Sequence, residues 1–303
     1  MNILKASEFL DAVCPCRLLP KDCFLNLVNI PLMSRVTSRR PLVSVIIPTY
    51  NSQQTISECI ESLMEQEYDN IEVIVVDGGS SDRTLDICRR YNTSIIKSEL
   101  GMAASRVRGA KEAKGDFLFH VDSDMELSPH LIDECVDLTK DFEALIIPEI
   151  NVGDSYWAEC TDIGKAISRR KKTGHLRFLK SDLYESVGGH NPHLLYKEDL
   201  ELHELVFRTG ATIGHTHNVI FHNIGDPSLF DILSQKISYF KSLSAYQDNS
   251  RVAQIRSKND ETSPLILIQE LARRPAYAPG YILITLLSAL LSQVFGKYYS
   301  LFG

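Results

Sequence analysis

The sequence lacks the cysteine framework that holds small secreted domains together. Its seven cysteines are odd in number and scattered, and Cys14 and Cys16 have no second pair at a metal-binding spacing. We therefore expect free thiols in a reducing compartment. The first residues also lack the apolar run of a secretory signal, because charged residues interrupt them throughout. Both absences predict a cytoplasmic location.

The chain is also short of positive charge. It carries 32 Lys and Arg against 39 Asp and Glu, which gives a net charge of −7. Without an overall positive field to attract phosphates, a nucleic-acid partner is excluded. The length of 303 residues allows one large domain or two small ones with a sizeable core.

From residue 41 onward, short apolar runs alternate with stretches of helical periodicity. The runs are too short for helices and are bounded by turn residues, as is typical of buried parallel strands. Strand–helix alternation with short loops predicts an α/β fold with a parallel sheet covered on both faces. The expected strands are 43–47, 71–76, 94–96 and 117–121, and the expected helices are 55–66, one through 85–88, and 102–113.

Three acidic residues, Asp122, Asp124 and Glu126, occupy alternate positions directly after the fourth apolar run. Carboxylates that end a strand lie at the carboxyl edge of a sheet, where open α/β sheets bind ligands. Oxygen ligands suit Mg²⁺ or Mn²⁺ bridging to a diphosphate. The alternative is a solvated acidic turn. Tyr50 and Asp77 follow the first two runs, so we expect them at the same edge.

Six motifs follow one another in a fixed order between residues 41 and 222. They are Val-Ser-Val-Ile-Ile-Pro-Thr-Tyr-Asn (43–51), Val-Val-Asp-Gly-Gly-Ser-Ser-Asp-Arg-Thr (75–84), Ser-Arg-Val-Arg-Gly-Ala (105–110), Asp-Ser-Asp (122–124), Val-Gly-Gly-His-Asn (187–191) and Lys-Glu-Asp-Leu-Glu-Leu (197–202). This ordered series resembles the family 2 glycosyltransferases. The resemblance implies the GT-A fold, a Rossmann-like and mostly parallel sheet with helices on both faces. It also implies a metal-dependent, inverting hexosyltransferase that moves a sugar from a nucleotide diphosphate to an acceptor hydroxyl.

The resemblance assigns donor contacts to four residues besides the acids. Pro48 and Tyr50 match positions that line the nucleoside of a UDP-, GDP- or dTDP-sugar. Arg106 matches an arginine that grips the diphosphate with parallel hydrogen bonds; the alternative is a solvated helix arginine. Gly78 stands where the family usually has a second acid that contacts the base. Asp77 therefore either contacts the donor or only orders its turn.

The resemblance also implies the metal ligands. Asp124 is expected to bind the Mn²⁺ or Mg²⁺, with Asp122 sharing the metal or lying nearer the ribose. Glu126 is a further candidate because alternate residues of an extended segment face the same way. His222 matches a late histidine that some GT-A enzymes use as a ligand, although a histidine at a strand end is often structural.

The acid pair Glu198 and Asp199 matches the catalytic base of inverting family members, usually the aspartate. Such a base takes the acceptor's hydroxyl proton while that oxygen attacks the anomeric carbon opposite the leaving diphosphate. The alternative is that both acids complement the dipole of a helix at 199–208.

We expect three parts in the chain. Residues 1–40 form an N-terminal extension without assigned chemistry. Residues 41–230 form the GT-A catalytic domain, with a nucleotide-sugar half at 41–127 and an acceptor half at 128–230. Residues 231–303 form a helical C-terminal region.

Two stretches of the C-terminal region predict a membrane-associated protein. Residues 234–246 form an amphipathic candidate helix with lysines and aromatics, and the nearly uncharged residues 277–295 approach the length of a span. With a basic loop at 165–180, they favour attachment to the cytoplasmic face and a lipid-linked acceptor such as a polyprenyl-phosphate glycan. The alternatives are a helix that packs on the catalytic domain or pairs two subunits, a solvated loop, and a soluble or protein-linked acceptor.

Two rival functions remain open. A sugar-nucleotide pyrophosphorylase shares the sheet and substrates, but the chain has Pro-Thr-Tyr-Asn at 48–51 where that class has a glycine-rich phosphate loop. A non-catalytic carbohydrate-binding relative is expected to lose some of Asp122, Asp124 and Asp199, and all three are present.

Overall fold

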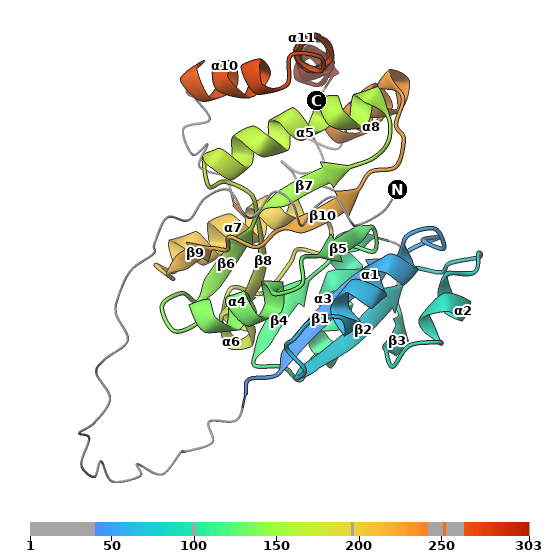
Figure 1. Ribbon diagram of the computed structural model, residues 1–303, viewed down its shortest axis with the longest axis vertical. Helices are drawn as coiled ribbons and strands as arrows, with labels where there is room; N and C mark the ends of the chain where they lie inside the picture. Colours follow the sequence, from blue (N-terminus) through green and yellow to red (C-terminus); the bar gives the residue numbers. More distant parts are fainter. Residues whose placement is uncertain (1–39, 99–100, 195–196, 242–250, 253–263, 303) are drawn as a thin grey trace, which may run out of the picture. The chain divides into compact units, whose positions relative to one another are not determined.

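The structure is a computed structural model that describes residues 40–98, 101–194, 197–241, 251–252 and 264–302 (Figure 1). The described residues from Arg40 onward belong to one compact unit. The expected extension 1–40 lies outside the described residues, apart from Arg40.

A seven-stranded sheet forms the centre of this unit. β1 pairs in parallel with β2 and β4, β2 pairs in parallel with β3, and β6 pairs in parallel with β9. β8 runs antiparallel to both β4 and β6. The expected α/β fold with a mostly parallel sheet is confirmed. In spatial order the strands are β3 (Ser94–Lys97), β2 (Ile71–Asp77), β1 (Val43–Thr49), β4 (Phe117–His120), β8 (His175–Lys180), β6 (Ala144–Ile147) and β9 (Ile213–His215).

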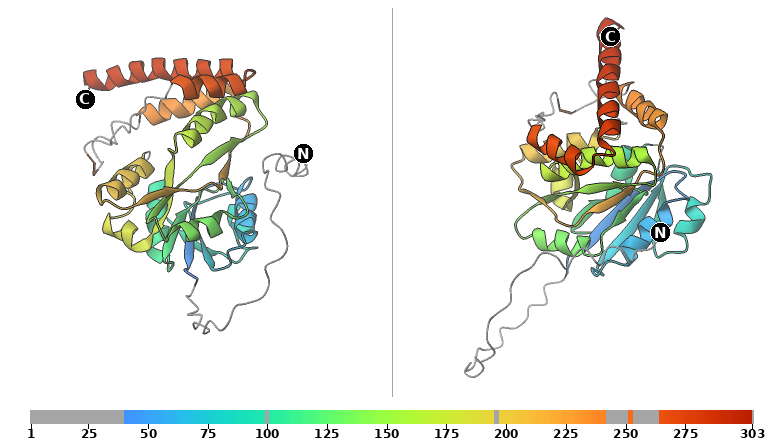
Figure 2. Two further views of the ribbon diagram at one scale, coloured as in Figure 1. Left: turned by 60° about the vertical axis from the view of Figure 1, so that its left-hand side comes forward. Right: turned by 45° about the horizontal axis from the view of Figure 1, so that its top comes forward.

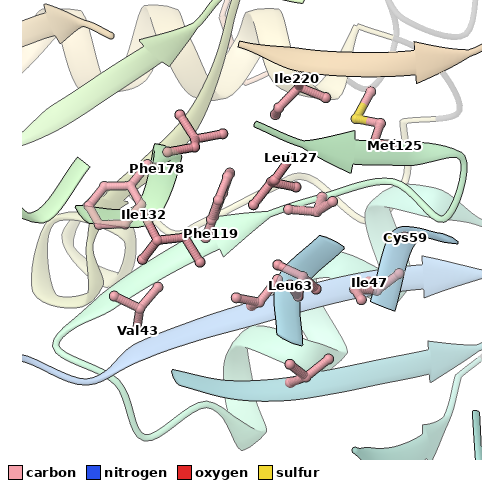
Figure 3. Close-up of a cluster of buried hydrophobic side chains, with 14 of the residues drawn as sticks. Val43, Ile47, Cys59, Leu63, Phe119, Met125, Leu127, Ile132, Phe178 and Ile220 are labelled. Carbon is pink, nitrogen blue, oxygen red and sulfur yellow. The ribbon is translucent and has the colours of Figure 1, made fainter. Parts of the chain in front are cut away.

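Side chains alternate across β1 and join a different apolar cluster on each face. Val43 and Ile47 pack with Cys59 and Leu63 of α1, as Figure 3 shows. Ile46 belongs to the opposite cluster, which includes residues of α6 and α7 and to which α3 contributes. The sheet is therefore covered on both faces. Its covering helices include α1 (Ile56–Met64), α2 (Thr84–Cys88), α3 (Met102–Glu112), α4 (Leu131–Leu138), α6 (Ser181–Ser186) and α7 (Glu198–Arg208).

A second, three-stranded sheet lies beside the acidic segment. β10 (Ile220–Asn223) pairs antiparallel with β5 (Met125–Leu127) and in parallel with β7 (Glu149–Val152). Its residue Ile220 joins Leu127 and Phe119 in the cluster of Figure 3. The pairing of β10 with β5 brings the end of the acceptor half next to the residues that follow β4.

The C-terminal helices pack on α5 (Tyr156–Arg170), which belongs to the acceptor half of the same unit. They are α8 (Leu229–Lys241), α10 (Pro264–Arg273) and α11 (Ala278–Phe302). Both α10 and α11 contact α5, and α11 also contacts α8 (Figure 2). Arg170 pairs with Glu270 at 3.0 Å, and Arg274 pairs with Asp162 at 2.8 Å. Within the described residues, no helix has both the length and the apolar character needed to cross a membrane.

The basic segment 165–180 is not the loop that we expected. It comprises the end of α5 and strand β8, and most of its cations are ion-paired. Arg169 pairs with Asp162 at 3.1 Å, and Lys165 pairs with Glu149 at 2.5 Å. Arg177 is buried between Glu149 and Asp122. The positive charges of this segment are therefore largely neutralised by acids distant in the sequence.

Candidate active site

The carboxyl ends of the parallel strands bring the first set of candidate residues to one edge. Thr49 of β1 lies in register with Asp77 of β2, and the Ser52 hydroxyl lies 2.8 Å from that of Ser123 after β4. Pro48 lies within β1, whereas the side chain of Tyr50 just beyond it is 54% exposed. An exposed aromatic ring at this edge is free to stack on a planar ligand.

Asp77 orders its own turn. Its carboxylate is buried and accepts hydrogen bonds from the backbone N–H groups of Gly79 and Ser80, both at 3.1 Å. These bonds hold the residues after β2 in place, which is the structural alternative that the sequence left open. A contact between Asp77 and a donor remains a prediction.

The acidic residues after β4 do not continue as an extended segment. The Met125 N–H donates to the Asp122 carbonyl at 3.1 Å, so Ser123 and Asp124 occupy a turn. Both carboxylate oxygens of Asp122 are held, by Arg106 Nη2 at 2.7 Å and by Arg177 Nη2 at 3.2 Å. Burial alone would raise the pKa of Asp122, but the two guanidinium groups hold it below the ordinary value.

Asp124 and His222 form a pair at this edge. The His222 Nε2 lies 3.3 Å from Asp124 Oδ2, and the Asn223 N–H donates to the Asp124 carbonyl at 2.8 Å. Asp124 Oδ1 and His222 Nδ1 are both buried without a hydrogen-bond partner. A carboxylate oxygen left in this state beside an imidazole fits a divalent cation.

Glu126 lies apart from this pair. It stands in β5 opposite Phe221, and burial together with the charge of Glu58 raises its pKa. Within the described residues, no cluster of three or more His, Cys, Asp and Glu side chains has a metal-binding arrangement. The turn at Asp124 breaks the alternation on which the expectation for Glu126 rested, and a role of Glu126 as a metal ligand remains a prediction.

Arg106 is the centre of a buried cluster of charges rather than a solvated helix arginine. Its side chain is 1% exposed, and its Nη1 donates to Glu198 Oε1 at 2.9 Å and also to Asp199 Oδ1. With Asp122 on Nη2, one guanidinium joins the acids of the β4 edge to the acids of α7. The donor-diphosphate role of Arg106 remains a prediction, and in this structure its charge is directed at carboxylates.

A close helix–sheet approach places Arg106 there. At Gly109, one turn farther along α3, an added Cβ would overlap Ile46 of β1 and touch Val76 of β2. Only a residue without a side chain allows α3 to lie this near the sheet. The guanidinium of Arg106 is thereby held at the edge.

The two acids of the Glu198–Asp199 pair have opposite environments. Burial alone would raise the pKa of Asp199, but Arg106 and the imidazoles of His175 and His190 hold it well below the ordinary value. Burial and the neighbouring charge of Asp199 raise the pKa of Glu198. Asp199 is thus the acid that carries the negative charge. Both acids also occupy the first turn of α7, so the dipole alternative holds as well.

Three further residues contact the acids of the site, Arg177 at Asp122 and two histidines at Asp199, and the sequence did not indicate these contacts. Arg177 and His175 alternate along β8, which pairs with β4, and His190 belongs to the motif at 187–191. The His175 Nδ1 lies 3.1 Å from Asp199 Oδ2, and His190 Nε2 lies 3.4 Å from Oδ1. These contacts span up to 55 residues, for Arg177 and Asp122, so no local spacing could have revealed them.

A mostly parallel sheet with carboxylates at its carboxyl edge and a second acid pair facing them agrees with the expected GT-A fold. Comparison with known proteins identifies the family of the chain. The family model described as glycosyl transferase family 2 matches residues 44–197, and the chain belongs to this family. The matched residues therefore form a family 2 glycosyltransferase domain.

Individual relatives agree with this assignment. EpsH of Bacillus subtilis is 29% identical over 193 residues, 60% of this chain and 54% of EpsH. The glycosyltransferase AglE of Haloferax volcanii is 30% identical over 208 residues, 61% of this chain and 67% of AglE. The match thus spans about half the length of EpsH.

Solved structures confirm the fold. The mannosyltransferase PcManGT from Pyrobaculum calidifontis, in complex with GDP-Man and Mn²⁺, gives a TM-score of 0.55 at 19% identity over 87% of this chain and 81% of that one. Residues 1–349 of S. aureus TarS, in complex with UDP-GlcNAc, give 0.51 at 18% identity over 86% and 91%.

Proposed function

We propose that the protein transfers a sugar, with inversion and with a divalent cation, from a nucleotide diphosphate to an acceptor hydroxyl. The observation that carries this proposal is that Arg106 pairs with two acids at once. One is Asp122, at the carboxyl edge of the sheet where we expect the donor, and the other is Asp199 of the acceptor half. An enzyme for a single displacement needs a donor group and a base on opposite sides of the reacting carbon.

Asp124 and His222 would hold the Mn²⁺ or Mg²⁺, and the diphosphate of the donor would complete its coordination. Two protein ligands suffice, because such ions are commonly bound by one or two protein groups plus substrate phosphates. When bound, the ion offsets negative charge on the leaving diphosphate. The complex of PcManGT with GDP-Man and Mn²⁺ supports this pairing of nucleotide-sugar and metal.

The chain's own groups would act on the donor and the acceptor. Pro48 and Tyr50 would line the nucleoside, while Asp77 keeps the neighbouring turn in place. Arg106 and Arg177 keep Asp122 ionised beside the diphosphate. Asp199 would act as the base that takes the proton of the acceptor hydroxyl. Glu198 is the second carboxyl group of α7 that pairs with the guanidinium of Arg106.

A nucleotide-release assay tests the transfer. The protein is incubated with UDP-, GDP- and dTDP-sugars in Mn²⁺, and free nucleoside diphosphate is measured with and without EDTA. We expect release from one donor class, lost with EDTA. Formation of nucleoside triphosphate from added pyrophosphate would instead favour the pyrophosphorylase alternative. Release that survives EDTA would contradict the metal assignment.

We also propose that residues 231–303 form a membrane-facing region of the enzyme, at the cytoplasmic face, and that the acceptor is lipid-linked. Both long C-terminal helices carry exposed apolar side chains. Leu265 and Ile268 of α10 are each 62% exposed, and Leu286 and Leu290 of α11 are each 59% exposed. Apolar residues at this spacing on a helix surface suit an interface with lipid.

Sedimentation with anionic vesicles tests the membrane proposal. The wild type is expected to pellet with vesicles, and the double variant Leu286→Ser and Leu290→Ser is expected to remain largely in the supernatant. Met64→Ser, an exposed apolar position on α1, serves as the control. A wild type that stays in the supernatant would remove the membrane and the lipid-linked acceptor, while the transferase assignment would stand.

A further inference from the structure

Helices α5 and α10 lie side by side (Figure 1), and four arginines line a cavity between them. Arg169 and Arg170 stand at the end of α5, and Arg273 and Arg274 stand where α10 ends. The cavity has a volume of about 430 Å³, which falls within the ~300–1,000 Å³ that is usual for ligand sites. It lies outside the site that contains Asp122 and the acids of α7.

The arginines of this cavity outnumber the acids that pair with them. The Nη1 atoms of Arg170 and Arg273 both donate to Oε1 of Glu270, at 3.0 and 2.9 Å. The other two arginines both pair with Asp162, at 3.1 and 2.8 Å. Both acids are buried. These six side chains therefore carry an excess of two positive charges, which a bound anion would neutralise.

An apolar surface borders the cavity on α10. It includes the exposed side chains of Leu265 and Ile268. Gln269 and Arg273 follow Leu265 at intervals of four residues, so the three lie along one side of the helix. Gln269 also accepts a hydrogen bond from Arg170 at 2.5 Å. A molecule with a phosphate group and a hydrocarbon chain can therefore place the phosphate among the arginines and the chain along α10.

We propose that this cavity binds the phosphate group of a membrane lipid, and that the lipid-linked acceptor supplies it. The inference rests on the proposed function, because it names the part of the acceptor that the C-terminal helices bind. A guanidinium group binds two phosphate oxygens through parallel N–H groups, so several arginines around one cavity suit a phosphate better than a single negative charge of another kind.

Arg169 connects the cavity to the candidate active site. It also lines a second cavity, together with Glu149 and His175. The His175 Nδ1 in turn lies 3.1 Å from Oδ2 of Asp199, the proposed base. A phosphate held beside Arg169 would keep the rest of the acceptor on the side of the molecule where that base lies. This connection favours the acceptor, rather than a bulk phospholipid, as the source of the phosphate.

The double variant Arg273→Gln and Arg274→Gln tests the site. It removes the two excess charges and leaves each buried acid with one arginine partner, Arg170 or Arg169. Sedimentation is measured with phosphatidylcholine vesicles that contain a polyprenyl phosphate, phosphatidylglycerol or oleate at equal surface charge. We expect affinity for the polyprenyl phosphate vesicles to fall about 10- to 30-fold, because each cation near an anionic surface contributes about fivefold.

A matched control removes two arginines elsewhere. Arg89→Gln combined with Arg108→Gln takes away two exposed cations of the nucleotide-sugar half, each paired with an acid of its own helix. This variant should bind all three kinds of vesicle within about threefold of wild type. Urea unfolding checks that both double variants are folded. Arg273→Gln alone, at a side chain that is 64% exposed, provides the test if the double variant does not fold.

The outcomes separate the site from its ligand and from the transfer function. A loss that is largest with the polyprenyl phosphate supports the inference. A loss that is equal for both phosphate lipids, or confined to phosphatidylglycerol, overturns the acceptor as the source and assigns the cavity to bulk headgroups. An equal loss with oleate, or no loss, overturns the phosphate site. No donor is present in these assays, so nucleotide release by the wild type would still support the transfer function if the inference fails.

Discussion

His222 lies 3.3 Å from Asp124, although 98 residues separate them in the chain. The approach depends on two local features. The turn after Asp122 points Asp124 away from the arginines, and the pairing of β10 with β5 sets His222 opposite Met125. The donor edge therefore contains two aspartates with different surroundings, one enclosed by guanidinium groups and one beside an imidazole.

The first prediction concerns this pair. Asp124→Asn and His222→Ala are each expected to weaken Mn²⁺-dependent donor binding about 10- to 100-fold, because each removes a proposed ligand. Titration calorimetry with and without Mn²⁺ measures the effect. Asp137→Asn, an exposed acid on α4, should bind like wild type. Full donor affinity in Asp124→Asn would show that the cation is held elsewhere.

The second prediction concerns Asp199. Asp199→Asn keeps the shape of the side chain and loses its charge, so donor binding should survive while transfer falls about 10²-fold or more. Parallel assays of donor affinity and sugar transfer separate the two quantities. Near-normal transfer by Asp199→Asn would exclude Asp199 as the catalytic base.

The third prediction is about stability. Arg106→Met leaves Asp122, Glu198 and Asp199 without their shared cation, and breaking a buried ion pair in this way costs roughly 3–5 kcal/mol. Urea unfolding followed by circular dichroism measures the loss. Arg108→Ala, on the exposed side of the same helix, should change the free energy of unfolding by about 0.5 kcal/mol or less. Equal effects at the two positions would contradict the buried cluster.

The fourth prediction is a pH dependence. Since the pKa of Glu198 is raised in the folded state, its contribution to stability is fully present below its unfolded value of roughly 4.3 and is lost as the pH rises toward its folded value. Glu198→Gln cannot ionise. Wild type should therefore lose stability relative to Glu198→Gln between pH 5 and 8, by about 1 kcal/mol or more. A stability difference between wild type and Glu198→Gln that stays constant over this pH range would refute the raised pKa.

The fifth prediction tests how α3 is positioned. Gly109→Ala forces α3 away from Ile46 and is expected to destabilise the protein by roughly 1–3 kcal/mol through overpacking. Gly164→Ala is the matched control on helix α5, where an added Cβ meets only Tyr281 at 3.6 Å. Thermal unfolding compares the two. If both glycines tolerate alanine equally, close packing does not position Arg106.

The nucleotide-binding half of the fold follows from local sequence, and most of the acceptor half does not. Apolar runs such as 43–47 are buried on both faces, so their periodicity survives in the structure. Strand β8 was missed because Arg177 interrupts its apolar residues. That arginine is nevertheless buried, since Glu149 and Asp122 neutralise it. Helix α10 lies in the region that was expected to be helical, but its bounds were not predicted.

Some residues of the candidate site could likewise be predicted from the sequence, and others could not. Pro48, Tyr50 and Asp124 could be placed at the edge from strand ends alone. The burial of Arg106 could not be foreseen, because its partners Glu198 and Asp199 lie more than 90 residues away. Long-range ion pairs leave no periodic pattern, so an arginine on a helix resembles a surface residue until the fold is known.

The burial of Arg106 also affects which acidic residues are retained in related proteins that have lost the activity. A descendant that no longer catalysed transfer would still need anions around this guanidinium in order to fold. Selection for folding alone would therefore preserve Asp122 and Asp199 through long evolutionary drift. Asp124 does not neutralise Arg106, and one of its carboxylate oxygens has no hydrogen-bond partner, so folding does not require it in the same way. Among diverged relatives, loss of the aspartate at position 124, rather than at 122 or 199, should therefore distinguish inactive proteins from active enzymes.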